Sequence, residues 1–172
     1  MKNLNPLTVT EKTISQIRNG AFLTVKADRK LNTMTIGWAT IGYVWQRPIL
    51  MVAVRNSRHT FGLLENAADF TVSIPMDKKW KDAVSCCGTK SGRDVDKFEV
   101  CGLQTAPSRR VGSPVIGITG LHFECKIVLK TPMDPAVMHR DLEKIYPQND
   151  YHTLYYGEIV ECYETDSRDE VR

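Results

Sequence analysis

The stretch from Asn32 to Gly42, NTMTIGWATIG, contains the pattern on which the fold assignment depends. Within it, residues 33–40 are rich in β-branched and bulky side chains, which favours a β-strand. Glycine weakens a strand interior, so Gly37 indicates either a flat ligand lying against the backbone or a bulge or tight bend. In the first case, the neighbouring threonines would supply polar contacts at the rim of the ligand.

Strand patterns continue on both sides of this stretch. Residues 21–27 form another β-rich run, and the polar residues 28–30 between the two runs are suited to a hairpin turn. Residues 49–54 are continuously apolar, which is typical of a strand buried on both faces. Further strands are expected over residues 69–75, 120–131 and 153–163, the last two with long alternation of apolar and polar side chains.

Helical patterns are short and lie between the strands. A helix is expected over residues 10–18, and Ser57 can cap a second one. A third, over residues 78–87, should end at Gly88 in the left-handed conformation, and another should begin at Asp94. Because strands dominate and no regular strand–helix alternation is present, a doubly wound sheet is disfavoured. We expect a mainly β fold, a closed antiparallel β-barrel with peripheral helices.

Composition places the chain among ordinary folded proteins. Its 172 residues, 42% hydrophobic and 25% charged, predict a single domain over residues 1–172. The net charge of +3 is spread along the chain, so no nucleic-acid partner is expected. The sequence shows no apolar block of signal or membrane-spanning length, which predicts a cytoplasmic protein without a membrane partner.

The cysteines are odd in number and lack the spacing of a zinc site, so no metal is expected. They are interpreted as reduced thiols that fill the core. Cys86 and Cys87 are adjacent, which also admits a redox role that the sequence leaves open. The five are Cys86, Cys87, Cys101, Cys125 and Cys162.

Two basic loops with hydroxyl side chains predict a site for a small anion. The first, from Arg55 to Thr60, reads RNSRHT and combines guanidinium groups, hydroxyls and a helix start. The second, residues 88–94, adds lysine, arginine and two glycines that let backbone amides turn toward a ligand. Taken singly, the first is equally a capped surface helix and the second a flexible connection between helices.

Four segments in order give the chain a specific resemblance. They are NTMTIGWATIG from Asn32, RNSRHT from Arg55, CGTKSGRDVDKF from Cys87 and HTLYYGEIV from His152. Together they resemble the flavin-reductase-like proteins, flavoredoxins among them, over nearly the whole chain. The resemblance implies an FMN-binding split barrel of Greek-key type. Asn56 and His59 depart from the proline and aromatic residues common there, without removing an expected phosphate ligand.

The resemblance also implies which residues bind the cofactor, FMN held without a covalent bond. Residues 34–40 would line the flavin ring or the ribityl chain, and the two basic loops would bind the phosphate. The cofactor-binding residues expected are Asn32, Met34, Thr35, Trp38, Ala39, Thr40, Arg55, Ser57, Arg58, Thr60, Lys90 and Ser91. His152 matches a histidine beside the nicotinamide or substrate, which suits a catalytic proton donor or an orienting hydrogen bond. Without the resemblance, a lone histidine is more often a structural residue.

The activity implied is that of an NAD(P)H-dependent flavin or ferric reductase, an oxidoreductase and flavoprotein. No GxGxxG fingerprint is present, so NAD(P)H would bind only transiently. Two alternatives stay open, a flavoredoxin-type electron carrier reduced by a redox protein partner and a non-catalytic FMN-binding protein. The family also implies a homodimer with the flavin near the subunit interface.

Overall fold

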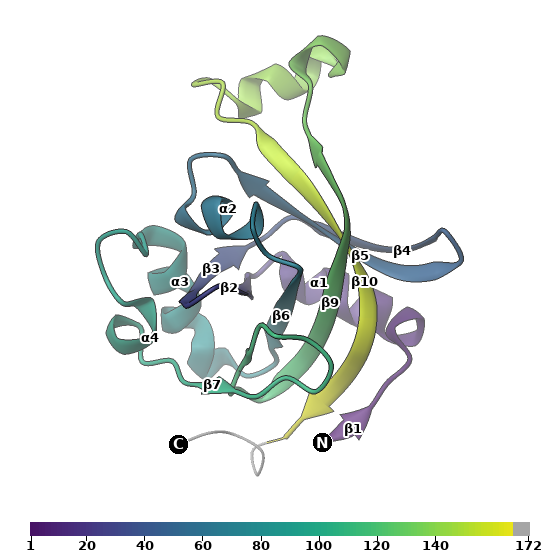
Figure 1. Ribbon diagram of the computed structural model, residues 1–172, viewed down its shortest axis with the longest axis vertical. Helices are drawn as coiled ribbons and strands as arrows, with labels where there is room; N and C mark the ends of the chain where they lie inside the picture. The colour runs from purple at the N-terminus through teal and green to yellow at the C-terminus, as the bar shows by residue number, and fades with distance from the viewer. Residues whose placement is uncertain (167–172) are drawn as a thin grey trace.

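The computed structural model describes residues 1–166 and consists of one strongly curved antiparallel sheet with helices around it (Figure 1). Every strand pair in the sheet is antiparallel. In spatial order the strands are β3 (Lys30–Ile36), β2 (Ala21–Ala27), β6 (Asp69–Pro75), β9 (Gly120–Pro132), β10 (His152–Thr165), β5 (Arg47–Arg55) and β4 (Ala39–Val44), and β1 (Lys2–Asn3) pairs with β10.

The sheet is open between β3 and β4, so it forms a split barrel and not the closed barrel that periodicity alone predicted. The single strand predicted over residues 33–40 is accordingly wrong. β3 ends at Ile36, two residues intervene, and β4 begins at Ala39 on the opposite edge of the sheet. The chain pairs with β2 up to Ile36 and with β5 from Ala39 onward. Between them, the carbonyl of Trp38 already accepts a hydrogen bond from the amide of Ala53 in β5 at 3.2 Å. Gly37 therefore marks a bend.

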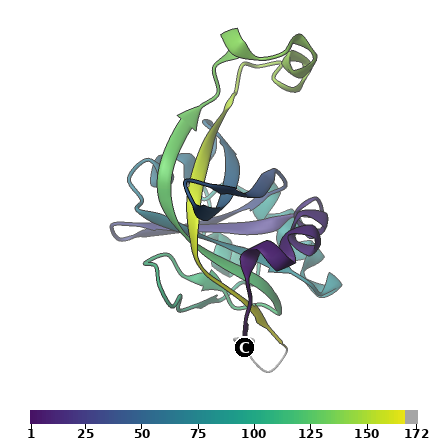
Figure 2. The same cartoon turned by 90° about the vertical axis from the view of Figure 1, so that its right-hand side faces the viewer.

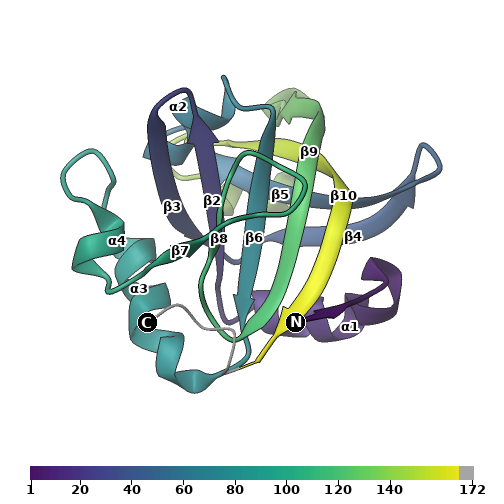
Figure 3. The same ribbon diagram turned by 60° about the horizontal axis from the view of Figure 1, so that its bottom comes forward.

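The predicted helices are present, with different ends. α1 (Thr10–Ile17) covers one end of the barrel, and α2 (His59–Leu64), α3 (Lys81–Thr89) and α4 (Lys97–Val100) lie beside β3 and β2 (Figure 3). Short 3-10 helices and a second small sheet complete the described chain: η1 (Pro6–Val9), η2 (Lys78–Trp80), η3 (Pro135–Val137), η4 (Arg140–Ile145), β7 (Thr105–Ala106) and β8 (Val115–Ile116). None of the helices within residues 1–166 is long and apolar enough to cross a bilayer.

Three predicted helix boundaries are wrong for physical reasons. Arg58, not Ser57, is the N-cap residue of α2, because the Ser57 hydroxyl donates to another loop. α3 passes through Gly88 and ends at Thr89, because Gly88 does not adopt the left-handed conformation expected of a stop; a Cβ there would make only ordinary contact with Thr35 at 3.5 Å. α4 begins after Asp96, whose Oδ1 accepts the Phe98 amide at 2.8 Å.

Two apolar clusters stabilise the fold. The larger fills the barrel and contains fully buried side chains of β2, β6, β9 and β10, such as Phe70, Phe123 and Tyr155. The smaller lies beneath α3 and α4 and contains Phe22 and Ile116. Side chains of α3 and Phe98 of α4 pack against this second cluster, which places the basic loop between the two helices beside the sheet.

β9 and β10 extend beyond the barrel as a long arm that carries η3 and η4 at its tip (Figures 1 and 2). Near the base of the arm the pairing register of β10 shifts between Tyr156 and Gly157. A Cβ at Gly157 would lie 2.6 Å from both the Cβ of Cys125 and the Cζ of Phe70. Glycine is therefore required where β10 bends closely over the core.

The interpretation of all five cysteines as reduced thiols is wrong for two of them. Cys86 in α3 and Cys101 after α4 form a disulfide, with their Cα atoms 5.7 Å apart. The fold brings these residues together, whereas their spacing in the sequence carries no such signal. Cys87, Cys125 and Cys162 are free and buried, as core packing predicted, and burial raises the pKa of each thiol.

Candidate functional site

The two basic loops meet at a pocket of about 110 Å³, referred to below as the basic pocket. It lies where β3, the start of α2 and the end of α3 come together. Its lining consists of Met34, Thr35, Ser57, Arg58, His59, Thr60, residues 87–93 and Lys97. The sequence-based prediction that both loops serve one site thus has a geometric basis, since residues thirty positions apart share the same cavity.

The basic pocket has the charge of an anion site. Arg58, Lys90, Arg93 and Lys97 contribute four cationic groups, and none of its lining residues is an aspartate or glutamate. The positive charge also affects His59, whose pKa is lowered first by burial and then by the charges of Arg93 and other basic groups. Hydroxyl donors from both loops complete a donor set suited to a phosphate group.

Lys97 is the member of this set that sequence reasoning missed. Its side chain is only 5% exposed, and its Nζ donates to the carbonyl of Cys87 at 2.8 Å. Burial lowers the pKa of this ammonium. The sequence pattern does not mark this burial, because Lys97 lies on a four-residue helix that is too short to show a periodic apolar face.

Arg93, the arginine of the second predicted loop, was not among the expected cofactor-binding residues, and it connects the two loops. Its Nη1 donates to the carbonyl of Ser57 at 3.0 Å. The neighbouring Gly92 packs so closely on β3 that a Cβ there would lie 2.3 Å from Oδ1 of Asn32. Asn32 in turn donates to the Thr60 hydroxyl at 2.8 Å, and both side chains are buried. Asn32 and Thr60 therefore brace the walls of the pocket.

A second pocket of about 180 Å³, the aromatic pocket, adjoins the first. Met34, Thr35 and Arg58 line both pockets, so the two form one elongated site. The remaining residues of the aromatic pocket are Ile36, Gly37, Trp38, Ala53, Arg55 and His152. The ring centroids of Trp38 and His152 are 4.7 Å apart. This end of the site combines the flat rings of Trp38 and His152 with the guanidinium groups of Arg55 and Arg58.

His152 is fixed at the edge of the aromatic pocket as a neutral imidazole. It is 7% exposed, and its Nδ1 lies 2.8 Å from the hydroxyl of Tyr146. Burial, followed by the charge of Arg55, lowers the pKa of His152 to about 4. At neutral pH the ring of His152 is therefore the neutral imidazole and not the imidazolium, which favours an orienting hydrogen bond over proton donation.

Four of the residues expected to bind the cofactor are placed differently from the rest. Ala39 and Thr40 lie on β4 and line neither pocket. The guanidinium of Arg55 lies at the aromatic pocket but donates to the carbonyls of Ile145 and Asp150 in the arm. Ser57 donates its hydroxyl to Oδ2 of Asp150 at 2.6 Å. Arg55 and Ser57 thereby attach the arm to the site. Ser91 lines the basic pocket and accepts the Arg93 amide at 3.2 Å.

Comparison with known proteins places the chain in a family. Residues 18–171 match the model described as the flavin reductase like domain. The chain belongs to this family. An uncharacterized protein of Archaeoglobus fulgidus is 29% identical over 139 residues, covering 81% of this flavin reductase like chain and 68% of the relative. The uncharacterized protein YddH of Escherichia coli is 28% identical over 134 residues, or 77% of this chain, and the match spans only 61% of that relative's length.

Solved structures share the fold of this flavin reductase like chain. The flavoredoxin from Methanosarcina acetivorans superposes with a TM-score of 0.68 at 22% identity, over 86% of this chain and 68% of the other. An FMN-binding protein from Thermus thermophilus, solved with p-hydroxybenzaldehyde, gives 0.65 at 23%, over 84% and 70%. A protein from Shewanella frigidimarina, described as a putative flavin reductase with a split barrel domain, gives 0.68 at 16%, over 95% and 76%. The split-barrel prediction is confirmed.

Proposed function

We propose that this protein binds FMN non-covalently and acts as an NAD(P)H-dependent flavin or ferric reductase. The observation that carries the proposal is the continuity of a cationic pocket without carboxylates and an aromatic pocket through Met34, Thr35 and Arg58. FMN has the same division, with a phosphate at one end and a flat ring at the other. Family membership and the FMN-binding neighbour support the choice of ligand.

The residues of the basic pocket fit a phosphate by their chemistry. Arg58 can donate two parallel hydrogen bonds to phosphate oxygens, and Lys90 and Lys97 add point charges. Ser91 provides a hydroxyl donor from the loop after α3. We assign the phosphate to this group and give Arg55 and Ser57 the supporting role of attaching the arm.

The aromatic pocket would receive the ring, and bound FMN would supply the group that accepts a hydride from a transient NAD(P)H donor. Trp38 is 45% exposed, so this side of the site is open to a donor and an acceptor in turn. His152, neutral and anchored through Nδ1 by Tyr146, holds its ring beside that of Trp38 and adds no charge of its own to the pocket. The chain's own residues thus bind and position, while proton movement at His152 is not required.

A cytoplasmic homodimer is part of the proposal. The arm exposes apolar side chains at its tip, where Val137 is 82% and Leu142 44% exposed. They border an apolar pocket of about 500 Å³ that reaches Trp38. A second copy of the chain covering the arm would therefore also border the aromatic pocket.

The activity is tested by stopped-flow mixing of the FMN-loaded protein with NADH and, separately, NADPH. A reductase bleaches the flavin absorbance with at least one donor. Absence of bleaching with both, with FMN still bound, would refute the reductase and leave the electron carrier reduced by a protein partner. The flavoredoxin among the structural neighbours makes that carrier the second candidate.

The site assignment is tested separately by Arg58→Ala. Removal of a guanidinium that binds phosphate is expected to weaken FMN binding at least about tenfold, equivalent to roughly 1.4 kcal/mol. Arg110→Ala is the matched control, because its side chain is 67% exposed and lines neither pocket. Equal FMN affinity in both variants would contradict the phosphate assignment.

A further inference from the structure

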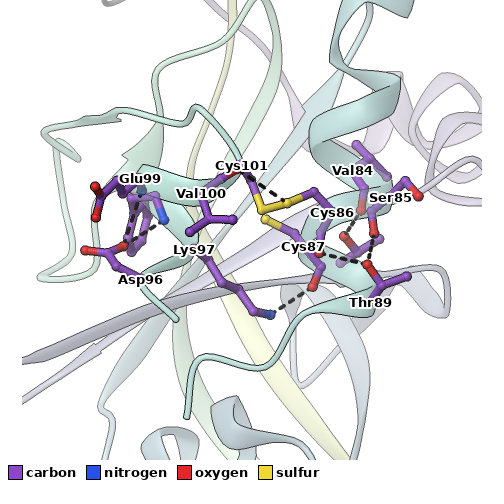
Figure 4. The surroundings of a disulfide bond; sticks show 12 residues. Val84, Ser85, Cys86, Cys87, Thr89, Asp96, Lys97, Glu99, Val100 and Cys101 are labelled. Carbon is purple, nitrogen blue, oxygen red and sulfur yellow. Dashed lines mark hydrogen bonds between the residues drawn. A yellow bond between two sulfur atoms is a disulfide. The ribbon is translucent and has the colours of Figure 1, made fainter. Parts of the chain in front are cut away.

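The disulfide between Cys86 and Cys101 closes residues 86–101, which include the second basic loop, into a covalent ring (Figure 4). The two cysteines are 15 positions apart, one in α3 and one directly after α4. The ring contains Lys90, Arg93 and Lys97, three of the four cations of the basic pocket. A single covalent bond therefore spans the segment that supplies most of the positive charge of the site.

Few other contacts fix α4, which begins at Lys97, against α3. The Lys97 ammonium donates to the carbonyl of Cys87 at 2.8 Å, and Phe98 packs in the smaller apolar cluster. α4 has only four residues, too short to be a stable helix without tertiary support. Opening the disulfide leaves the position of Lys97 dependent on that packing and on one hydrogen bond.

The third thiol in this region does not compete for the disulfide. Cys87 is buried next to Cys86, and burial raises the pKa of its thiol to about 11. Since thiolates and not thiols attack disulfides, Cys87 is a poor nucleophile at neutral pH. Cys86 itself is half-buried. Exchange with Cys87 is therefore disfavoured, and Cys86 is the more exposed of the two bonded cysteines, since Cys101 is buried.

We propose that Cys86 and Cys101 form a reversible redox site that sets the affinity of the basic pocket for a phosphate-bearing ligand. A dithiol reduces the disulfide: two electrons and two protons pass to the cysteines, giving two thiols, and the reductant becomes a disulfide. Reduction loosens the loop and lowers the affinity, because a ligand must then order the cations that the closed ring holds in place. Disulfides that form in reducing compartments are commonly of this switchable kind.

The inference rests on the proposed function only through its probe, FMN. The experiment compares the air-oxidised full-length protein with the same protein after dithiothreitol, and measures FMN affinity by equilibrium dialysis. Alkylation and peptide mass mapping verify that Cys86 and Cys101 are linked before reduction and free after it. Reduction is expected to weaken FMN binding about tenfold, and reoxidation to restore it.

Cys86→Ser with Cys101→Ser is the control for effects of the reductant itself. The double variant is expected to bind FMN as weakly as the reduced protein, with no response to dithiothreitol. Far-UV circular dichroism establishes that it folds. If it does not, the comparison of oxidised and reduced wild type still tests the inference.

Hydrogen exchange of peptides covering residues 88–100 gives a readout independent of FMN. Exchange is expected to quicken on reduction. Unchanged exchange together with unchanged FMN affinity would overturn the redox site while leaving the proposed function intact. Absence of FMN binding in both redox states would instead refute the proposed function, and exchange alone would then decide whether the disulfide controls the loop.

Discussion

Lys97 provides the sharpest test of the site, because its charge is buried in the wall of the basic pocket. Lys97→Met removes the charge and keeps the length of the side chain. We expect the variant to fold and to lose affinity for FMN. If Lys97 served only the fold, Lys97→Met would leave the affinity for FMN unchanged.

The magnitude follows from what Lys97 contacts. A hydrogen bond to a charged group contributes about 1.5–3 kcal/mol, so its loss corresponds to roughly a 10- to 100-fold weaker affinity. The fold experiences two opposing changes. The Cys87 carbonyl loses its donor at 2.8 Å, which costs about 1–3 kcal/mol, while the desolvation that lowers the pKa of Lys97 is relieved. The net change in stability is therefore small.

The assay is a titration of the apoprotein with FMN, in which binding is measured as quenching of the flavin fluorescence. Lys81→Met, at the exposed first residue of the same helix pair, is the matched control and should leave the dissociation constant unchanged. An affinity of Lys97→Met within about threefold of the wild type would refute the assignment of Lys97 to the phosphate, because such a change is below the contribution of one charged hydrogen bond.

Three further predictions concern the fold. His122 is 1% exposed and has its pKa lowered from 6.5 to about 4, so the folded state binds fewer protons; its stabilisation is complete above pH 6.5 and lost toward pH 4. Urea unfolding should show a loss of stability across that window to which His122 contributes about 3 kcal/mol, and His122→Asn should remove this share while the share of His152, whose pKa is also lowered to about 4, remains. Gly157→Ala should lower the melting temperature by roughly 2–12 °C by overpacking the core, whereas Gly62→Ala, with no atom within 4 Å of the added Cβ, should not lower it. Thr60→Val leaves the buried Asn32 amide without its partner and should cost about 1–3 kcal/mol in chemical denaturation; an unchanged midpoint would contradict the bracing role.

Local chemistry carried most of the fold. The β-rich runs at residues 21–27 and 69–75 coincide with β2 and β6, because side-chain alternation and polar turns act over a few residues. The position of Gly37 at a bend could not be predicted from the neighbouring residues. Whether a glycine in such a run lies within a strand or at a bend depends on which strand the following residues pair with, here β5. That choice is made by tertiary contacts.

The sequence predicted that the site binds an anion, but it did not predict all the residues that line the site. The loops around Arg58 and Lys90 carry hydroxyls and cations in patterns that indicate an anion, and both line the basic pocket. Lys97 was not predicted as a site residue, because a lysine on a short helix is ordinarily solvated and only the fold shows that this one is buried. The partner of Cys86 was likewise hidden, since disulfide pairing cannot be deduced from spacing alone.

The break in the sheet has a mechanical consequence for the site. β3 and β4 are the outermost strands of the sheet, and within residues 1–166 no strand ladder joins them, although only Gly37 and Trp38 separate them along the chain. These two residues also line the aromatic pocket. The two edges can therefore move apart about this short connection at the expense of side-chain contacts, with every ladder of the sheet intact. The barrel can widen at the one seam where a flat molecule would enter, while the rest of its wall keeps its shape.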